Sequence, residues 1–168
     1  SGARAVAAHV LRGEKNEEIR LLQGSEAEMH AAMKDAEAAG AKYGLRHYKI
    51  SPAEEMTSED ARQVLADLAA EFGFDPDRAT LIEHRKPRAG GGGFDRHWHA
   101  IVPEVDPVSG RILDSHWMRP RHEKIARMAE ARLGHEVVPG RFNRAVQQHL
   151  EAEGRLDVAA RLEPATQV

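Results

Sequence analysis

Two histidines one residue apart, His97 and His99, stand in the stretch "DRHWHAIV". Successive side chains of a β-strand point to opposite faces, so these two imidazoles would share one face. A third histidine, His84, lies near the end of the preceding run "RATLIEHR", and a hairpin would bring it to the same face. The chain has no cysteine, so a metal must be held by His, Asp or Glu. Three neutral imidazoles suit zinc, manganese, nickel or copper and leave positions open for substrate oxygens.

The acids around these histidines have different expected positions. Glu83 precedes His84 and should point to the opposite face. Trp98, which lies between His97 and His99, should point to that face as well. Glu104 and Asp106 follow the pair, where a carboxylate can hold an imidazole N–H beside a metal. The sequence "DPVSG" equally favours a turn there, so both interpretations stay open.

Alternating strands and helices must position these side chains. Apolar, β-branched and aromatic content predicts strands over 16–24, 43–51, 78–85 and 96–105, and helical spacing predicts helices over 3–13, 25–40, 57–73, 118–134 and 140–154. Ser25, and Thr57 or Ser58, are the expected N-caps. Four consecutive glycines, residues 90–93, suit a flexible hairpin loop between the two histidine strands. The order predicts an α+β fold with a central, mainly antiparallel sheet flanked by helices.

Length and composition bound the organisation of the chain. With 168 residues and 41% hydrophobic residues, it can bury one sizeable core, and a single domain over 1–168 with a disordered tail at 161–168 is expected. No apolar run is long enough to cross a bilayer, so the chain is expected to be soluble. Ser1 suggests that the natural N-terminus lies upstream.

Charge is distributed unevenly along the chain. Residues 84–147 hold twelve Lys or Arg against seven Asp or Glu, whereas residues 1–83 hold ten basic against sixteen acidic residues. Such asymmetry is associated with polyanion binding. Part of the basic segment also fits a solvated helix face, because Glu123 and Arg127 have i, i+4 spacing.

The stretch "EHRKPRAGGGGFDRHWHAIVPEVDPVSGRILD" resembles the metal motif of conjugative and mobilisation relaxases, the HUH endonucleases, in which one histidine precedes a His-hydrophobic-His strand. The following "SHWMRPRHEKIARMAEARLGHEVVPGRFNRAV" is similar to relaxases of proteobacterial plasmids and integrative elements. The resemblance covers about residues 3–146. The chain departs from many relaxases in the glycine-rich insertion between His84 and His97.

The resemblance implies an HUH-type fold and a metal site formed by His84, His97 and His99. The expected cofactor is Mn²⁺ or Mg²⁺, with Zn²⁺ or Ni²⁺ possible in vitro. The expected reaction is nicking and rejoining of one DNA strand at an origin of transfer, through a covalent 5′-phosphate intermediate. It also implies a bacterial cytoplasmic protein, the N-terminal part of a longer chain, that enters the recipient cell with DNA. Expected partners are single-stranded origin-of-transfer DNA, relaxosome accessory proteins and a type IV coupling protein.

Most relaxases attack with a tyrosine on an N-terminal helix, and this chain has none there. The matching position is His9, which resembles mobilisation relaxases that use histidine, and a neutral imidazole is a competent nucleophile. The alternative for His9 is a partly buried polar residue on an alanine-rich helix. Tyr48 is the rival nucleophile, and Asn16 and Glu17 are expected to orient His9 or to cap the strand.

Residues expected to contact DNA are basic or aromatic. Phosphate contacts give affinity and salt dependence, and exposed aromatic rings stack on bases. The expected contacts are Arg12, Trp117, Arg119, Arg121, Lys124 and Arg127, with Phe94 as a further stacking candidate.

Two other functions fit the same residues. A rolling-circle replication initiator shares the metal motif and usually carries a tyrosine in a late helix, which residues 119–168 lack. A non-catalytic DNA-binding domain would use the histidines to bind a structural metal. Nicking of a supercoiled plasmid that carries the cognate origin distinguishes the latter from both enzymes.

Overall fold

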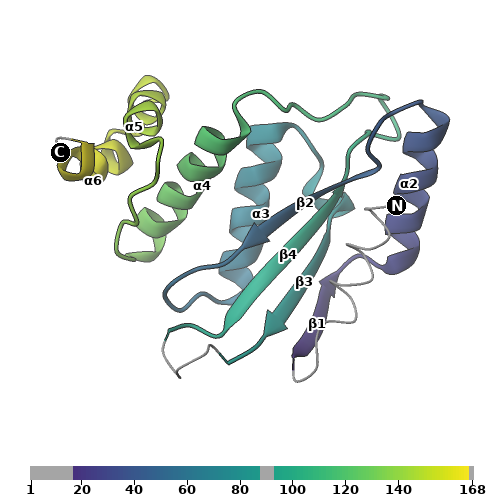
Figure 1. Ribbon diagram of the computed structural model, residues 1–168, viewed down its shortest axis with the longest axis horizontal. Helices are drawn as coiled ribbons and strands as arrows, with labels where there is room; N and C mark the ends of the chain where they lie inside the picture. The colour runs from purple at the N-terminus through teal and green to yellow at the C-terminus, as the bar shows by residue number, and fades with distance from the viewer. Residues whose placement is uncertain (1–16, 88–92, 167–168) are drawn as a thin grey trace. The chain divides into compact units, whose positions relative to one another are not determined.

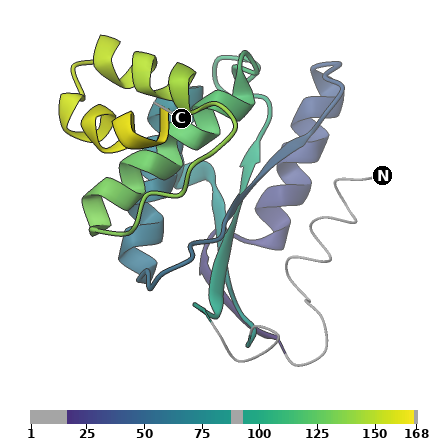
Figure 2. The same cartoon turned by 60° about the vertical axis from the view of Figure 1, so that its left-hand side comes forward.

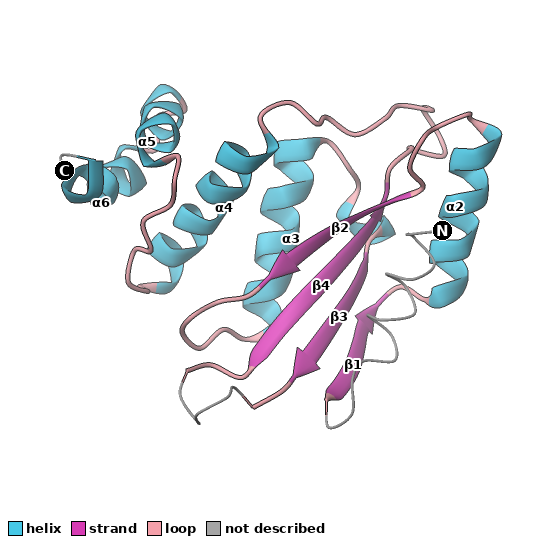
Figure 3. Cartoon of the chain, viewed as in Figure 1, coloured by secondary structure: helices cyan, strands magenta, loops and turns pink. Residues whose placement is uncertain are grey.

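The computed structural model describes residues 17–87 and 93–166, and the side chains only as far as Leu162. The described elements are β1 (Glu18–Gln23), α2 (Glu26–Ala38), β2 (Leu45–Ile50), α3 (Ser58–Phe72), the short 3-10 helix η1 (Pro76–Arg78), β3 (Thr80–Arg85), β4 (Arg96–Pro103), α4 (Met118–Leu133), α5 (Asn143–Ala152) and α6 (Leu156–Thr166) (Figures 1 and 3). The predicted strands and four of the predicted helices are confirmed. The predicted helix over 3–13 lies outside the described residues, and the sequence missed η1 and α6.

Local capping explains where the helices begin and end. Ser25 accepts a hydrogen bond from the amide of Glu28 at the start of α2. At the start of α3, Thr57 and Asp60 form a reciprocal capping box, which decides between the two expected caps. Gly73 ends α3 in the left-handed conformation, with φ of 80°, which a residue without Cβ adopts at little cost.

The four strands form one sheet in the order β1-β3-β4-β2, and every neighbouring pair is antiparallel. The α+β prediction with an antiparallel central sheet is therefore confirmed. The hairpin strands β3 and β4 lie in the centre, while β1 and β2 are the edges. This order matters for the site, because each histidine strand has a different outer neighbour.

Helices cover both faces of this sheet. On one face, Met29 of α2 packs with Ile82 and Ile101 in a buried cluster. On the other, Phe72 of α3 stacks on Tyr48, with ring centroids 5.6 Å apart. The second view shows α2 and α3 on opposite sides of the sheet (Figure 2). The histidines of β3 and β4 share the α2 face, because they alternate in phase with the two isoleucines.

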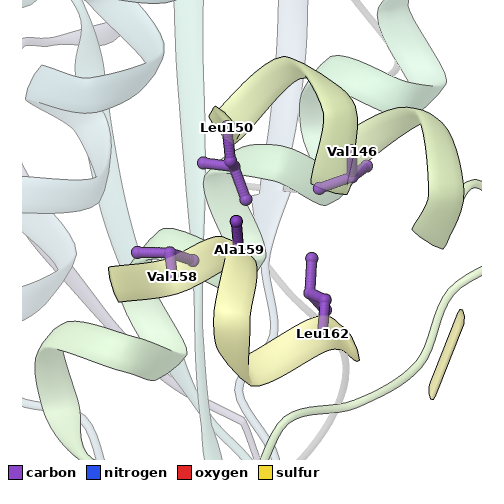
Figure 4. Close-up of a cluster of buried hydrophobic side chains, with 5 residues drawn as sticks. All are labelled: Val146, Leu150, Val158, Ala159 and Leu162. Atoms are coloured by element: carbon purple, nitrogen blue, oxygen red, sulfur yellow. The ribbon is translucent and has the colours of Figure 1, made fainter. Parts of the chain in front are cut away.

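The chain divides into two compact units, Ser1–Asp114 and Ser115–Val168, whereas its length favoured one. That both form a single relaxase domain stays a prediction. The second unit contains α4, α5 and α6, and its buried cluster consists of Val146, Leu150, Val158, Ala159 and Leu162 (Figure 4).

The structure differs from the prediction of a disordered tail at 161–168. Helix α6 continues to Thr166, and Leu162 is fully buried. The physical reason is the apolar face formed by Val158, Ala159 and Leu162, which packs against α5 and is stabilised by that burial. None of the described helices is long and apolar enough to cross a membrane.

Candidate metal centre

Three histidines converge on one face of the β3–β4 hairpin. His84 is directly opposite His97, and His99 is opposite Ile82, two residues from His84. The three ring centroids lie 4.5 to 5.1 Å apart, and one nitrogen of each ring lies within 4.8 Å of the others. His84 and His99 are buried, while His97 is half-buried. The hairpin predicted from the sequence thus brings the three imidazoles together.

The interior position keeps His99 neutral. Burial, together with the nearby His47 and His84, lowers the pKa of His99 to about 3. A neutral imidazole has a lone pair to offer, which a protonated one lacks. Nε2 of His99 is buried and has no hydrogen-bond partner within the described part of the chain. An unpaired buried nitrogen beside two other imidazoles fits a divalent cation as its missing partner.

A carboxylate stands beside His84. Glu17 precedes β1, and since Ile19 pairs with His84, residue 17 falls in phase with the histidine face. Oε2 of Glu17 lies 3.4 Å from Nδ1 of His84, and the two side chains are 7% and 1% exposed. A carboxylate in this position holds the imidazole proton on Nδ1 and leaves Nε2 to a metal. The sequence placed Glu17 as a partner of His9 or a strand cap; the structure places it against a candidate ligand.

Two residues of edge strand β2 also belong to this face, and the sequence missed both. Lys49 is directly opposite His99, and His47 is directly opposite Ile101. Nε2 of His47 lies 2.5 Å from Nδ1 of His99. Lys49 is exposed and adds to the lowering of the pKa of His99. The alternation of "RHYKI" shows that residues 47 and 49 share a face. It does not show which strand pairs with this segment, because that depends on residues far away in the sequence.

The structure does not bring Tyr48 to the histidines. Tyr48 pairs with Ala100 and so points to the opposite face, where its ring stacks on Phe72 and Phe74. It is only 4% exposed. This corrects the prediction of Tyr48 as the alternative nucleophile, because Tyr48 is a core residue on the α3 face. Side chains alternate along β2, so Tyr48 and its neighbour His47 lie on opposite faces of the sheet.

The remaining acids have other partners. Glu83 faces away from the triad, as expected, and contacts Arg96 and Ser58. Glu104 forms a buried ion pair with Arg46 of β2.

Asp106 accepts hydrogen bonds from the amides of Val108 and Ser109. Both bonds lower the pKa of Asp106, and the bond from the Ser109 amide has the larger effect. Of the two interpretations of this segment, the turn is therefore the one that fits Asp106.

A pocket of about 280 Å³ adjoins the triad. It is lined by Ser51, Lys86, Pro87, Phe94, Asp95, Arg96 and His97. Phe94 stacks on Trp98, with centroids 6.2 Å apart, and Trp98 itself is fully buried on the opposite face. Of these two aromatic rings, Phe94 is therefore the one that lines a space next to a candidate ligand.

The residues expected to contact DNA in α4 and directly before it fall into two groups. Trp117 is 65% exposed and Arg119 is exposed, whereas Arg121 is half-buried and donates to the carbonyl of His116. The structure corrects the predicted DNA contacts of Lys124 and Arg127. Lys124 is 2% exposed and Arg127 is 7% exposed, and they pair with Glu153 and Glu130 respectively. These two cations stabilise the second unit rather than present charge at its surface.

His9, Arg12 and Asn16 lie outside the described residues. Their expected roles as nucleophile, DNA contact and orienting residue stay predictions.

A comparison with protein families gives a match over most of the chain. The family model described as "Relaxase: MobA/VirD2-like, nuclease domain" matches residues 7–135. This range contains the three histidines, Glu17, His47 and the start of the second unit. Neither the curated proteins nor the solved structures contain a match to the chain.

Proposed function

The chain belongs to the MobA/VirD2-like relaxase family, and on that premise we propose that it nicks and rejoins one DNA strand at an origin of transfer during plasmid mobilisation. The observation that carries the proposal is the convergence of His84, His97 and His99 on one face of the sheet. The expected product of the first step is a protein joined covalently to a 5′-phosphate.

His84, His97 and His99 would hold the divalent cation, with Mn²⁺ or Mg²⁺ as the cellular metal and Zn²⁺ or Ni²⁺ as substitutes in vitro. A cation held by these three neutral imidazoles would keep its full charge and would supply polarisation of the scissile phosphate. The lowered pKa of His99 supports this role, because that ring stays unprotonated throughout the neutral range.

We assign the nucleophile to His9. A ring nitrogen of neutral His9 attacks the phosphorus, the P–N bond forms, and the bond from phosphorus to the 3′ oxygen breaks. The 3′ oxygen leaves with a proton, and the imidazole loses its remaining N–H proton. The result is a phosphoramidate, and attack by a 3′-hydroxyl on that bond reverses the step and rejoins a strand.

Single-stranded DNA is the substrate that the histidine face and the pocket beside it suit. Lys49 places a positive charge opposite His99, and the pocket next to His97 contains Lys86, Arg96 and an aromatic ring, Phe94. Cations that follow a phosphate backbone, together with rings that stack on bases, are typical of single-strand binding. Relaxosome accessory proteins, a type IV coupling protein and passage with the DNA from the donor cytoplasm to the recipient are part of the same proposal.

The test is a covalent-adduct assay. The protein is incubated with Mn²⁺ and single-stranded oligonucleotides that tile the origin of transfer of the element encoding it. Adducts are then detected by denaturing gel and intact mass. We expect an adduct that His9→Ala and a chelator abolish, and that mild acid releases because a phosphoramidate is acid-labile. Tyr48→Phe is the matched control and should form the adduct normally.

The other outcomes discriminate between mechanisms. An acid-stable adduct that survives His9→Ala would remove His9 as nucleophile. Metal binding without any adduct, on every oligonucleotide, would favour the non-catalytic DNA-binding domain.

A further inference from the structure

A fourth histidine contacts the triad from the edge of the sheet. His47 lies on β2, pairs with Ile101 of β4 and shares a face with His99. Nε2 of His47 is 2.5 Å from Nδ1 of His99, and the two rings are tilted by 31° with centroids 4.8 Å apart. His47 is exposed, whereas His99 is only 5% exposed. A ring nitrogen of the edge strand therefore contacts the buried candidate ligand directly.

The position of one proton decides what this contact does. Two neutral imidazole nitrogens at hydrogen-bond distance need a proton between them. If His99 carries its proton on Nδ1, that N–H donates to His47 and the Nε2 lone pair is free. If the proton sits on Nε2, it is a buried donor, and Nε2 has no hydrogen-bond partner among the described residues. A cation would satisfy a lone pair at Nε2 but not an N–H donor there, so the first arrangement is the one that suits a metal site.

His47 is placed as a partner of the ligand and not as a fourth ligand. Metal–nitrogen bonds of about 2.0–2.1 Å separate two tetrahedral nitrogen ligands by about 3.3 Å. The 2.5 Å between the nitrogens of His47 and His99 is too short for two ligands of one ion and places them in direct hydrogen-bonding contact.

We infer that His47 is a positioning residue that accepts a hydrogen bond from Nδ1 of His99 and thereby fixes the tautomer and ring orientation that direct Nε2 to the metal. The inference rests on the proposed metal site. It complements Glu17, which contacts Nδ1 of His84. Two of the three ligands would then be held from outside, one by a carboxylate and one by an imidazole.

The tautomer can be read without metal or DNA. In the metal-free protein labelled with ¹⁵N-histidine, multiple-bond ¹H–¹⁵N correlations distinguish the two neutral forms of each ring. We expect His99 in the Nδ1–H form, and a loss of that form, or a mixture, in His47→Ala. A His99 that is Nε2–H in the wild-type protein would overturn the inference.

Metal affinity provides the second readout. Titration calorimetry with Mn²⁺ should show about 10–100-fold weaker binding for His47→Ala, the usual effect of removing an outer partner of a ligating histidine. His47→Gln should recover most of the affinity, because its side-chain oxygen can accept the same hydrogen bond. His30→Gln, at a histidine that pairs with Glu26 on α2, is the matched control and should bind as the wild type does. Circular dichroism checks that every variant is folded.

The two proposals can fail separately. Unchanged affinity in His47→Ala, or an equal loss in His47→Ala and His47→Gln, would overturn the role of His47 even if the protein nicks DNA. The expected affinities without any covalent adduct would overturn the relaxase reaction and leave the role of His47 intact.

Discussion

Two of the three candidate metal ligands contact residues outside the triad. Glu17 contacts His84 and His47 contacts His99, in each case at Nδ1. A neutral ring that is held at one nitrogen presents the other, so we propose that these contacts determine which atoms would face a bound cation. The affinity of the site is therefore expected to vary with its outer partners as well as with its ligands.

Glu17→Gln should weaken Mn²⁺ binding by about 10–100-fold, because the amide removes the negative charge that favours the Nδ1–H form of His84. Titration calorimetry measures the effect. Glu18→Gln is the matched control, since Glu18 pairs with Arg85 and lies on the opposite face of the sheet. Equal affinities for both variants would show that Glu17 does not act on the ligand.

Lys49→Gln should weaken binding of single-stranded DNA and leave Mn²⁺ affinity within a few fold. Loss of one phosphate contact is expected to reduce the slope of log affinity against log salt concentration by about 0.7. Fluorescence anisotropy over a series of salt concentrations measures that slope. Lys42→Gln, at an exposed lysine before β2, should leave the slope as in the wild type, and an unchanged slope for Lys49→Gln would exclude a phosphate contact.

At the scale of elements, edge strand β2 is fixed to the chain that follows β4. Nε of Arg46 donates to Glu104 at 3.0 Å, and the guanidinium also donates to the carbonyl of Asp114 at 2.7 Å. Arg46 and Glu104 are 8% and 7% exposed. This pair lies on the face opposite His47, so it holds the strand that carries His47 without taking part in the site.

Arg46→Met should lower the free energy of unfolding by about 3–5 kcal/mol, because it leaves the Glu104 carboxylate buried without its cation. Urea denaturation measures the change. Adding Glu104→Gln to Arg46→Met should restore part of the stability, since a neutral amide costs less to bury. Arg111→Met, at an exposed arginine, is the control and should change stability by less than about 0.5 kcal/mol. A loss of stability in Arg46→Met as small as that in Arg111→Met would contradict the stabilising role of the Arg46–Glu104 pair.

For the whole molecule, the division into two units places the candidate metal site in one unit and helices α4, α5 and α6 in the other. His84, His97, His99, Glu17 and His47 all belong to Ser1–Asp114. The second unit has its own buried cluster around Leu150, which is fully buried.

Leu150→Ala should destabilise the second unit by about 2–5 kcal/mol, the usual cost of removing a buried leucine side chain. Mn²⁺ affinity should remain that of the wild type, because no ligand or ligand partner lies in this unit. Thermal denaturation and calorimetry measure the two quantities. Leu156→Ala, at a leucine that is 65% exposed, is the matched control. A parallel loss of metal affinity in Leu150→Ala would show that the units depend on each other.

Local sequence determined the strands, most of the described helices and the triad. Helix ends follow from caps within a few residues, as at Thr57 and Gly73, and strand alternation decides which neighbours share a face. His84 and His97 meet because their strands are consecutive in the chain and pair antiparallel, so only the pairing of neighbouring strands had to be inferred. Resemblance to relaxases, carried by the same histidines, predicted the family that the match over 7–135 confirms.

Tertiary structure alone decided which other residues join the site and which apparent surface cations are buried. His47 and His99 are 52 residues apart in sequence, and their contact depends on β2 pairing with β4, which no local pattern specifies. Glu17 likewise reaches His84 only through the pairing of β1 with β3. The burial of Lys124 depends on Glu153 from beyond α5. Caps and alternation act between near neighbours, whereas strand order and helix packing follow from the burial of apolar surface over the whole chain, and only that burial brings distant residues together.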